Sequence, residues 1–504
     1  MGVIKRQSIK GTIVNYVGAA IGMFTTFFIL TKYLSPEVIG LTRTLIDAGI
    51  LLAGLAQIGT NSSILRFYPY FKDAENKDNG FFFWTLIIPI IGFSIYILVF
   101  LIFKNYLSNF FFEQSELFVN YFYIIIPLGF FILYQTVFET NSIVLHRIVV
   151  PIFVREVGIR LMILLSYFLY AYHYLSITGL VIAICCTYGI AAIINLIYLF
   201  YLGRISLKPN FKHITKPLRR NFFFYTLFLM GSALTLTVMP SLATFFVAAK
   251  LGLAFAGIYT IARYIVAFIE IPYRSLGSIS NPHLSQSLKD NDLKATNGLV
   301  KKISLHQFLI GSAIFFVVWT NIDLIFQIIP NGKDYLSGKW VVFILGLFTL
   351  MNTSLTVGGV VLNYSRYYYY SLIFTFILVT GGITLNALCI PAFGINGAAL
   401  ATISSYTIYY ILLLSLVNWK VKVNSFSLEQ LKALTIILFL FVLDYLWKQS
   451  VTIFIMQYVK PTLGVSFVEA LLRTIVLGGI GFLSVYYWHI SEEVDVLIKK
   501  YILK

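Results

Sequence analysis

Hydrophobic residues run along the chain in long blocks that short polar connections separate. About fourteen blocks approach the roughly 20 residues that a helix needs to cross the core of a bilayer. The strands of a membrane barrel would instead alternate over segments about half as long. We therefore predict an all-α, polytopic membrane protein with about fourteen transmembrane helices. The expected spans are 10–33, 38–63, 81–103, 117–143, 151–174, 177–203, 221–248, 254–281, 303–329, 339–362, 367–389, 395–418, 431–449 and 463–488.

The basic residues are distributed unevenly between the two sides of these spans. The formal net charge is +17, and most Lys and Arg fall on the loops that share a side with the N-terminus. This bias marks the inner side of a membrane and argues against nucleic acid as the partner that explains the charge. It predicts that both termini are cytoplasmic. The basic segment 204–220 is expected to be an inner loop, with binding of anionic lipid as the alternative.

Composition supports a membrane protein without a metal site. Of the 504 residues, 59% are hydrophobic and 11% are charged, whereas a soluble domain has about 25% charged residues. The first block is too long for the apolar core of a signal peptide, so we expect it to be a permanent span. Three cysteines, Cys185, Cys186 and Cys389, lie in apolar blocks without metal-ligand spacing. We expect no metal and no cofactor.

The sequence also contains an internal similarity. Segment 127–147 aligns without gaps to 344–364, at an offset of 217 residues that also separates Gly40 from Gly257. Segments 177–188 and 395–406 are similar at an offset of 218. The offset spans six helices, an even number, so the two halves should share one orientation as a parallel repeat. We predict a six-helix bundle over 1–210, a second one over 211–420, and two additional helices with a cytoplasmic tail over 421–504.

Two similar halves predict a cleft between them, which in transporters of this design binds substrate. Ionisable side chains inside spans are costly in lipid and are therefore candidates for that cleft. Arg263, Glu270 and Arg274 share one helical stripe, because steps of 7 and 11 residues return to nearly the same face. The predicted substrate-binding residues are Arg43, Arg263, Arg274 and Asn15, and the predicted ion-coupling residues are Asp47, Glu270 and Glu139.

Each of these residues has a structural alternative. Arg43–Asp47 and Glu270–Arg274 have the spacing of simple i,i+4 ion pairs. Arg274 could extend to the lipid headgroups, and Glu139 could accept a local hydrogen bond instead of coupling a proton or cation. For the later residues Asp444, Glu469 and Arg473, we favour structural or interfacial roles.

The candidate chemistry is binding rather than catalysis. Arginine matches phosphate or carboxylate groups bidentately, so a cavity lined by arginines favours an anionic ligand. The sequence contains no G-x-S-x-G, Walker or H-E-x-x-H motif, and we predict that the chain is not an enzyme.

Three segments resemble a known family. They are TKYLSPEVIGLTRTLIDAGILLAGLAQIGTNSSILRF (31–67), AAKLGLAFAGIYTIARYIVAFIEIPYRSLGSISNPHLSQ (248–286) and FGINGAALATISSY (393–406). In order and spacing they resemble the first hairpin, the seventh-to-eighth helix region and the twelfth helix of the polysaccharide exporters. This family is similar to the oligosaccharide (O-antigen type) flippases of the multidrug/oligosaccharidyl-lipid/polysaccharide exporter superfamily.

The resemblance implies a bacterial inner-membrane protein that moves an undecaprenyl-diphosphate-linked oligosaccharide to the periplasmic leaflet. It implies two six-helix bundles around a basic cavity and a cycle coupled to protons or sodium. The expected partners are this lipid-linked oligosaccharide, membrane lipids, and the polysaccharide polymerase and chain-length machinery, with the chain acting as a monomer. The alternatives are a flippase for the peptidoglycan lipid precursor and a cation-coupled multidrug exporter. A membrane polysaccharide polymerase is less favoured.

Overall fold

The computed structural model describes residues 2–73, 77–203, 206–208, 210, 238–290, 292–458, 462–491, 493 and 495. Within these ranges the regular elements are helices and no strand occurs. Eleven helices of the described residues are long and apolar enough to cross a membrane. The prediction of an all-α, multi-pass membrane protein is therefore confirmed.

Two of the expected spans are joined in one helical element. Helix α16 (Tyr370–Leu416) covers the predicted spans 367–389 and 395–418, which meet at Gly394. At Gly394 the backbone leaves the helical region, with φ 58° and ψ −140°. This turn favours glycine, because a side chain is strained at positive φ. The chain thus changes direction there without a polar loop.

A third expected span, 151–174, is built from three consecutive elements. They are α7 (Val149–Phe153), the π-helical turn η4 (Val154–Gly158) and α8 (Ile159–Ala171). The expected span 221–248 lies largely outside the described residues, which include its end in a helix over Val238–Leu251. The basic segment 204–220 also lies mostly outside them.

The chain forms two compact units. The first comprises Met1–Thr260 and Asn386–Ala398, and the second comprises Ile261–Leu385 and Ala399–Lys504. Helix α11 (Leu253–Val266) begins in the first unit and ends in the second. The predicted bundles 1–210, 211–420 and 421–504 follow the internal repeat, and they stay a prediction.

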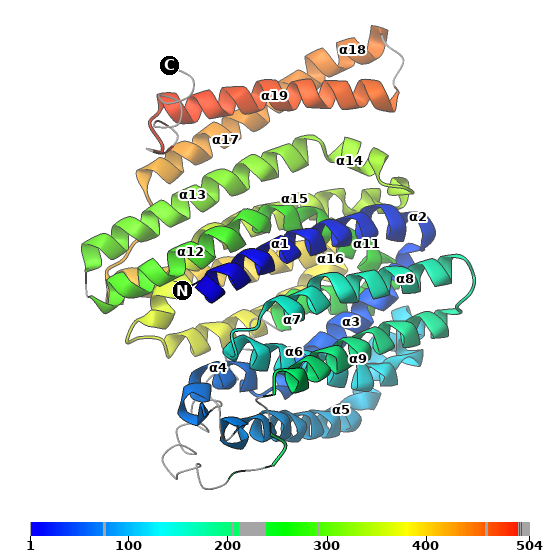
Figure 1. The fold of residues 1–504 in the computed structure, drawn as a ribbon. Helices are drawn as coiled ribbons and strands as arrows, with labels where there is room; N and C mark the ends of the chain where they lie inside the picture. Colours follow the sequence, from blue (N-terminus) through cyan, green and yellow to red (C-terminus); the bar gives the residue numbers. More distant parts are fainter. Residues whose placement is uncertain are drawn as a thin grey trace. The chain divides into compact units, whose positions relative to one another are not determined.

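In the first unit, four long helices lie side by side (Figure 1). They are α3 (Pro36–Ala56), α5 (Phe81–Asn120), α6 (Ile125–Val144) and α9 (Ile177–Tyr201). Helix α1 (Gly2–Phe24) packs against α7 and η4. Ser35 caps α3 by accepting a hydrogen bond from the Val38 amide, and Pro36 supplies a suitable first helical residue. The other elements are η1 (Thr25–Leu30), α2 (Thr31–Tyr33), α4 (Thr60–Phe71), η2 (Lys77–Gly80) and η3 (Phe122–Ile124).

In the second unit, α13 (Leu293–Thr320) packs against α12 (Glu270–Lys289) and α15 (Lys339–Tyr364). Helices α17 (Leu428–Trp447) and α19 (Leu463–Tyr487), orange and red in Figure 1, pack against each other and against α13. A reciprocal capping box between Ser427 and Gln430 starts α17. The other elements are η5 (Ala267–Ile269), α14 (Ile322–Ile328), η6 (Gly332–Gly338), η7 (Val417–Val421), η8 (Lys448–Thr452) and α18 (Ile453–Tyr458).

The segment that follows α19 is tied to α13 through the carboxylate of Glu493. This carboxylate accepts hydrogen bonds from Lys302 Nζ, from His306 Nε2 at 2.9 Å and from Ser491 Oγ at 3.1 Å. Burial alone would raise the pKa of Glu493. The hydrogen bond from Lys302, a backbone hydrogen bond and the charge of His306 together lower that pKa from 4.5 to about 2.

We expect this attachment to weaken as the pH falls from 4.5 to about 2. A carboxyl whose pKa is lowered by folding stabilises the attached state above its unfolded pKa, and this contribution is lost on protonation. Hydrogen–deuterium exchange of residues 489–495, corrected for the intrinsic effect of pH, should rise across this range. The rise in exchange should be absent in Glu493→Gln. It should be present in the control Glu116→Gln, which changes an exposed residue. An unchanged pH dependence in Glu493→Gln would contradict the assignment.

Candidate functional site

Two of the predicted site residues form an ion pair in the middle of α3. Arg43 Nη2 lies 2.6 Å from Asp47 Oδ1, and the Asp47 side chain is only 1% exposed. A buried carboxylate without a cation would cost several kcal/mol, and Arg43 supplies a cation next to Asp47. The structure thus brings a predicted substrate-binding residue and a predicted ion-coupling residue into direct contact.

Glu139, the third predicted ion-coupling residue, is also paired. It is buried on α6, where its Oε2 accepts a hydrogen bond from Gln135 Nε2 at 3.2 Å. Its Oε1 accepts a hydrogen bond from Arg155 Nη1, and the two residues form an ion pair. The local hydrogen bond that was the alternative for Glu139 is therefore present, together with a cation from a different helix.

This contact belongs to a longer chain of charges. Arg155 Nε lies 3.0 Å from Glu156 Oε1, and Arg160 Nη2 lies 2.7 Å from Glu156 Oε2. Arg160 Nη1 donates a hydrogen bond to the carbonyl oxygen of Gly18 on α1. Positive and negative groups thus alternate from Glu139 on α6, through η4 and α8, to the backbone of α1.

The backbone permits this arrangement in two ways. Arg155 and Glu156 lie on the π-helical turn η4, an irregularity that recurs at functional sites. Gly18 lets α1 approach η4 closely, because an added Cβ there would lie 2.5 Å from the carbonyl oxygen of Glu156. Small residues at such positions are typical of tightly packed membrane helices.

Exposure differs along the charge chain. The side chain of Glu139 is 7% exposed, whereas those of Arg155 and Arg160 are 43% and 35% exposed. An exposed guanidinium inside a membrane span is costly in lipid, and such groups almost always face a bundle interior or a water-filled cavity. We interpret the two arginines as the accessible part of the site and Glu139 as its buried part.

Our sequence reasoning did not identify Arg155, Glu156 or Arg160. The available signal was REVGIR (155–160), a dense charged motif inside the apolar block 151–174. Helical spacing does not identify Arg155 as the partner of Glu139, because the two residues are 16 positions apart in the sequence. The pair forms only because α6 and the segment after it fold back as neighbours.

The remaining predicted residues belong to both units. Asn15 is exposed on α1. Arg263 and Glu270 are partly buried in the second unit, where Glu270 acts electrostatically on Tyr406. The side chain of Arg274 lies outside the described residues. The roles of these residues stay predictions.

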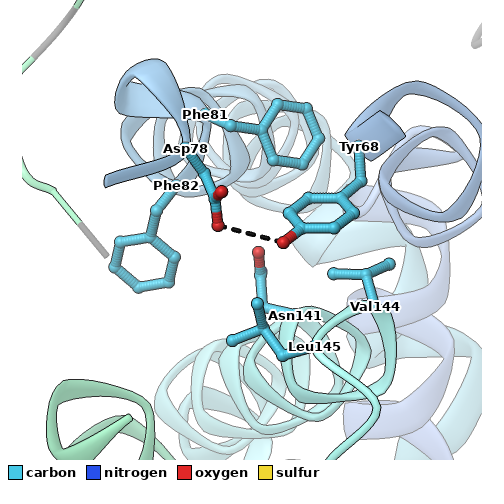
Figure 2. Close-up of a pocket in the computed structure, with 7 residues that line it drawn as sticks. All are labelled: Tyr68, Asp78, Phe81, Phe82, Asn141, Val144 and Leu145. Carbon is cyan, nitrogen blue, oxygen red and sulfur yellow. Dashed lines mark hydrogen bonds between the residues drawn. The ribbon is translucent and has the colours of Figure 1, made fainter. Parts of the chain in front are cut away.

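A small pocket lies where α4 and α6 end and α5 begins (Figure 2). Figure 2 shows the side chains of Phe81, Phe82 and Asn141 around the hydrogen bond from Tyr68 Oη to Asp78 Oδ2, which measures 3.0 Å. The other oxygen of Asp78 accepts a hydrogen bond from the Asp73 amide, and the hollow has room for about one water molecule. None of the predicted site residues lines it, so we assign it to fixing the connection before α5.

Comparison with solved structures identifies similar folds. A structure titled lipid II flippase MurJ, inward closed conformation, has a TM-score of 0.68 at 16% identity, covering 95% of this chain and 99% of that chain. An inward-facing multidrug resistance MATE family transporter of the MOP superfamily has a TM-score of 0.63 at 13% identity, covering 80% and 94%. Because the identities are low, these similarities support the fold alone.

Sequence comparison gives the family. An uncharacterized membrane protein of Methanocaldococcus jannaschii is 22% identical over 437 residues, covering 81% of this chain and 83% of that protein. The model of the family described as polysaccharide biosynthesis protein matches residues 8–288, more than half of the chain. The chain therefore belongs to the family described as polysaccharide biosynthesis protein.

Proposed function

We propose that this chain moves an undecaprenyl-diphosphate-linked oligosaccharide from the cytoplasmic to the periplasmic leaflet of a bacterial inner membrane. The observation that carries the proposal is the set of ion pairs inside the spans, Arg43–Asp47 and Arg155–Glu139. A guanidinium matches the oxygens of a diphosphate, and a buried carboxylate next to it can exchange that arginine for a proton or cation. The family and the fold support a membrane transporter of this class.

The proposed cycle assigns one of two roles to each predicted residue. The substrate-binding residues hold the diphosphate or acidic sugars while the lipid tail stays in the bilayer; they are Arg43, Arg263, Arg274 and Asn15. The ion-coupling residues alternate between pairing with an arginine and binding a proton or sodium ion; they are Asp47, Glu270 and Glu139.

A flippase for the peptidoglycan lipid precursor is the second candidate, favoured by the similarity to the structure titled lipid II flippase. Both candidates share the diphosphate chemistry and differ in the head group. Complementation of a strain depleted of its peptidoglycan flippase separates them. Growth rescue would favour the peptidoglycan precursor, and absence of rescue at normal protein levels would favour the oligosaccharide.

A cation-coupled multidrug exporter is the third candidate, favoured by the similarity to the MATE transporter. The predicted substrate-binding residues include three arginines, Arg43, Arg263 and Arg274, which suit an anion better than a cationic drug and disfavour this function. Drug-resistance profiling of a deletion strain tests it. A membrane polysaccharide polymerase would instead require a changed glycan chain length with intact flipping.

Deletion of the gene is expected to trap the lipid-linked oligosaccharide in the cytoplasmic leaflet. The trapped intermediate should be inaccessible to an external glycan-modifying enzyme, and wild type should restore access. Arg43→Ala and Arg263→Ala should each slow restoration at least about tenfold, because a charge-assisted hydrogen bond contributes about 1.5–3 kcal/mol.

Lys339→Ala is the matched control, because Lys339 pairs with Asp323 at the exposed end of another helix. It should restore access as wild type does. If both arginine variants also restored access at normal protein levels, the assignment of these arginines would be wrong. Absence of a trapped intermediate in a strain without another flippase would favour the drug exporter.

A further inference from the structure

The charge chain of the first unit contains one residue that is shared between two carboxylates. Arg155 donates through Nη1 to Glu139 and through Nε to Glu156. Glu156 has a second cation, Arg160, at 2.7 Å. Among the described residues, the charged groups that act on Glu139 are Arg155 and Glu156, both from η4. Loss of Arg155 would therefore leave Glu139 without a cation, whereas Glu156 would remain paired.

We propose that Arg155 couples anion binding to proton uptake by exchanging Glu139 for a phosphate group of the substrate. The inference rests on the proposed function and adds to it a residue that the sequence analysis did not identify. Arg155 is the more exposed member of the pair, so an incoming anion meets its guanidinium before it meets Glu139. The ligand class is an oxyanion of the diphosphate type, which guanidinium binds bidentately.

Charge balance determines where the proton goes. The four side chains Glu139, Arg155, Glu156 and Arg160 carry two positive and two negative charges in the resting arrangement. An added phosphate anion would leave this set negative in surroundings of low dielectric constant. One proton from water, bound at Glu139 Oε1 as Arg155 Nη1 departs, removes one negative charge. When the anion leaves, Arg155 returns and the proton is released.

The surroundings of Glu139 suit this exchange. Gln135 Nε2 contacts the other carboxylate oxygen at 3.2 Å, and this neutral amide can hydrogen-bond to a charged or a protonated carboxyl group. A buried carboxylate that loses its cation becomes neutral rather than remaining charged. Arg155 lies on the π-helical turn η4, a backbone irregularity of the kind that recurs at functional sites.

The test measures anion binding and proton uptake together in the purified full-length protein. The probe is farnesyl diphosphate at pH 8, titrated by calorimetry in two buffers that differ in ionisation enthalpy. Wild type should take up about one proton per bound probe. Glu139→Gln should bind the probe with proton uptake near zero. Arg155→Gln should bind at least about tenfold more weakly, because it lacks the charged donor.

One further variant separates coupling from folding. Lys339→Gln, in the second unit, should behave as wild type. All variants are compared in the same detergent, and only variants whose thermal stability equals that of wild type are included. Proton uptake that persists in Glu139→Gln, or wild-type affinity in Arg155→Gln, would overturn the proposal.

Failure of the inference is distinguishable from failure of the proposed function. Trapped oligosaccharide in the deletion strain, with no proton uptake on probe binding, would remove only the role of Arg155. Proton-coupled probe binding, with no trapped oligosaccharide, would support the role of Arg155 in anion binding while the flippase function fails.

Discussion

Arg473→Ala is expected to lower the free energy of unfolding by about 3–5 kcal/mol, because it removes the buried cation that two buried carboxylates share. Arg473 is buried on α19. Its Nε lies 3.5 Å from Asp444 Oδ1 and its Nη1 lies 3.8 Å from Glu469 Oε1. Both carboxylates are themselves buried. Thermal and denaturant unfolding in detergent would measure the loss.

The same arginine joins the last helices to α13. Arg473 Nη2 donates to the carbonyl oxygen of Thr320 at 2.8 Å and contacts Asn321 Oδ1 at 3.3 Å. A cation at the C-terminal end of a helix is favourable, and α13 ends at Thr320. Alanine would leave that carbonyl without this donor. The variant should therefore loosen α17 and α19 from α13 as well as destabilise each helix.

Controls on the same network give the prediction its specificity. Lys448 lies 3.0 Å from Asp444 but is 35% exposed, so Lys448→Ala should cost at most about 1 kcal/mol. Combining Arg473→Met with Asp444→Asn and Glu469→Gln removes the charges together and should recover much of the loss. Equal losses in Arg473→Ala and Lys448→Ala would contradict the role of Arg473. This structural role for Asp444, Glu469 and Arg473 is the one that the sequence favoured.

The fold could be predicted because membrane helices are encoded locally. A block of about 20 apolar residues is sufficient to indicate a span, whatever its neighbours are. Where the structure departs from simple spans, the cause is a backbone detail. Gly394 turns the chain inside α16, and η4 inserts a π-helical turn into the expected span 151–174. Hydrophobic periodicity does not report such turns.

The candidate site was predictable only where its contacts are local. Arg43 and Asp47 are four residues apart on α3, so helical geometry alone places them together. The Arg155–Glu139 pair joins two helical segments 16 residues apart, and Arg160 reaches Gly18 over 142 residues. These contacts depend on which helices become neighbours, and a single sequence does not specify that.

Gly40→Ala is expected to destabilise the protein by about 1–3 kcal/mol through overpacking. An added Cβ on Gly40 would lie 1.8 Å from the carbonyl oxygen of Leu253, and one on Gly257 would lie 2.0 Å from the carbonyl oxygen of Pro36. Both obstacles are backbone atoms of α3 and of the first turns of α11, within the first unit, and neither can rotate away. Unfolding in detergent and transport in the deletion strain would both report the change.

The sign of the effect distinguishes a close helix contact from helix propensity. In an open helical position, alanine in place of glycine is favourable by up to about 1 kcal/mol. Gly381 and Gly478 are matched controls, because both are helical and an added Cβ would have nothing within 4 Å. Alanine at Gly381 or Gly478 should therefore increase the stability of the protein or leave it unchanged, whereas alanine at Gly40 or Gly257 should lower it. Gly40 and Gly257 are also equivalent positions of the predicted repeat. Similar losses of stability in the two alanine variants would therefore indicate that the two halves of the repeat approach closely at this contact. Stability of Gly40→Ala equal to that of the controls would show that α3 and α11 do not pack this closely.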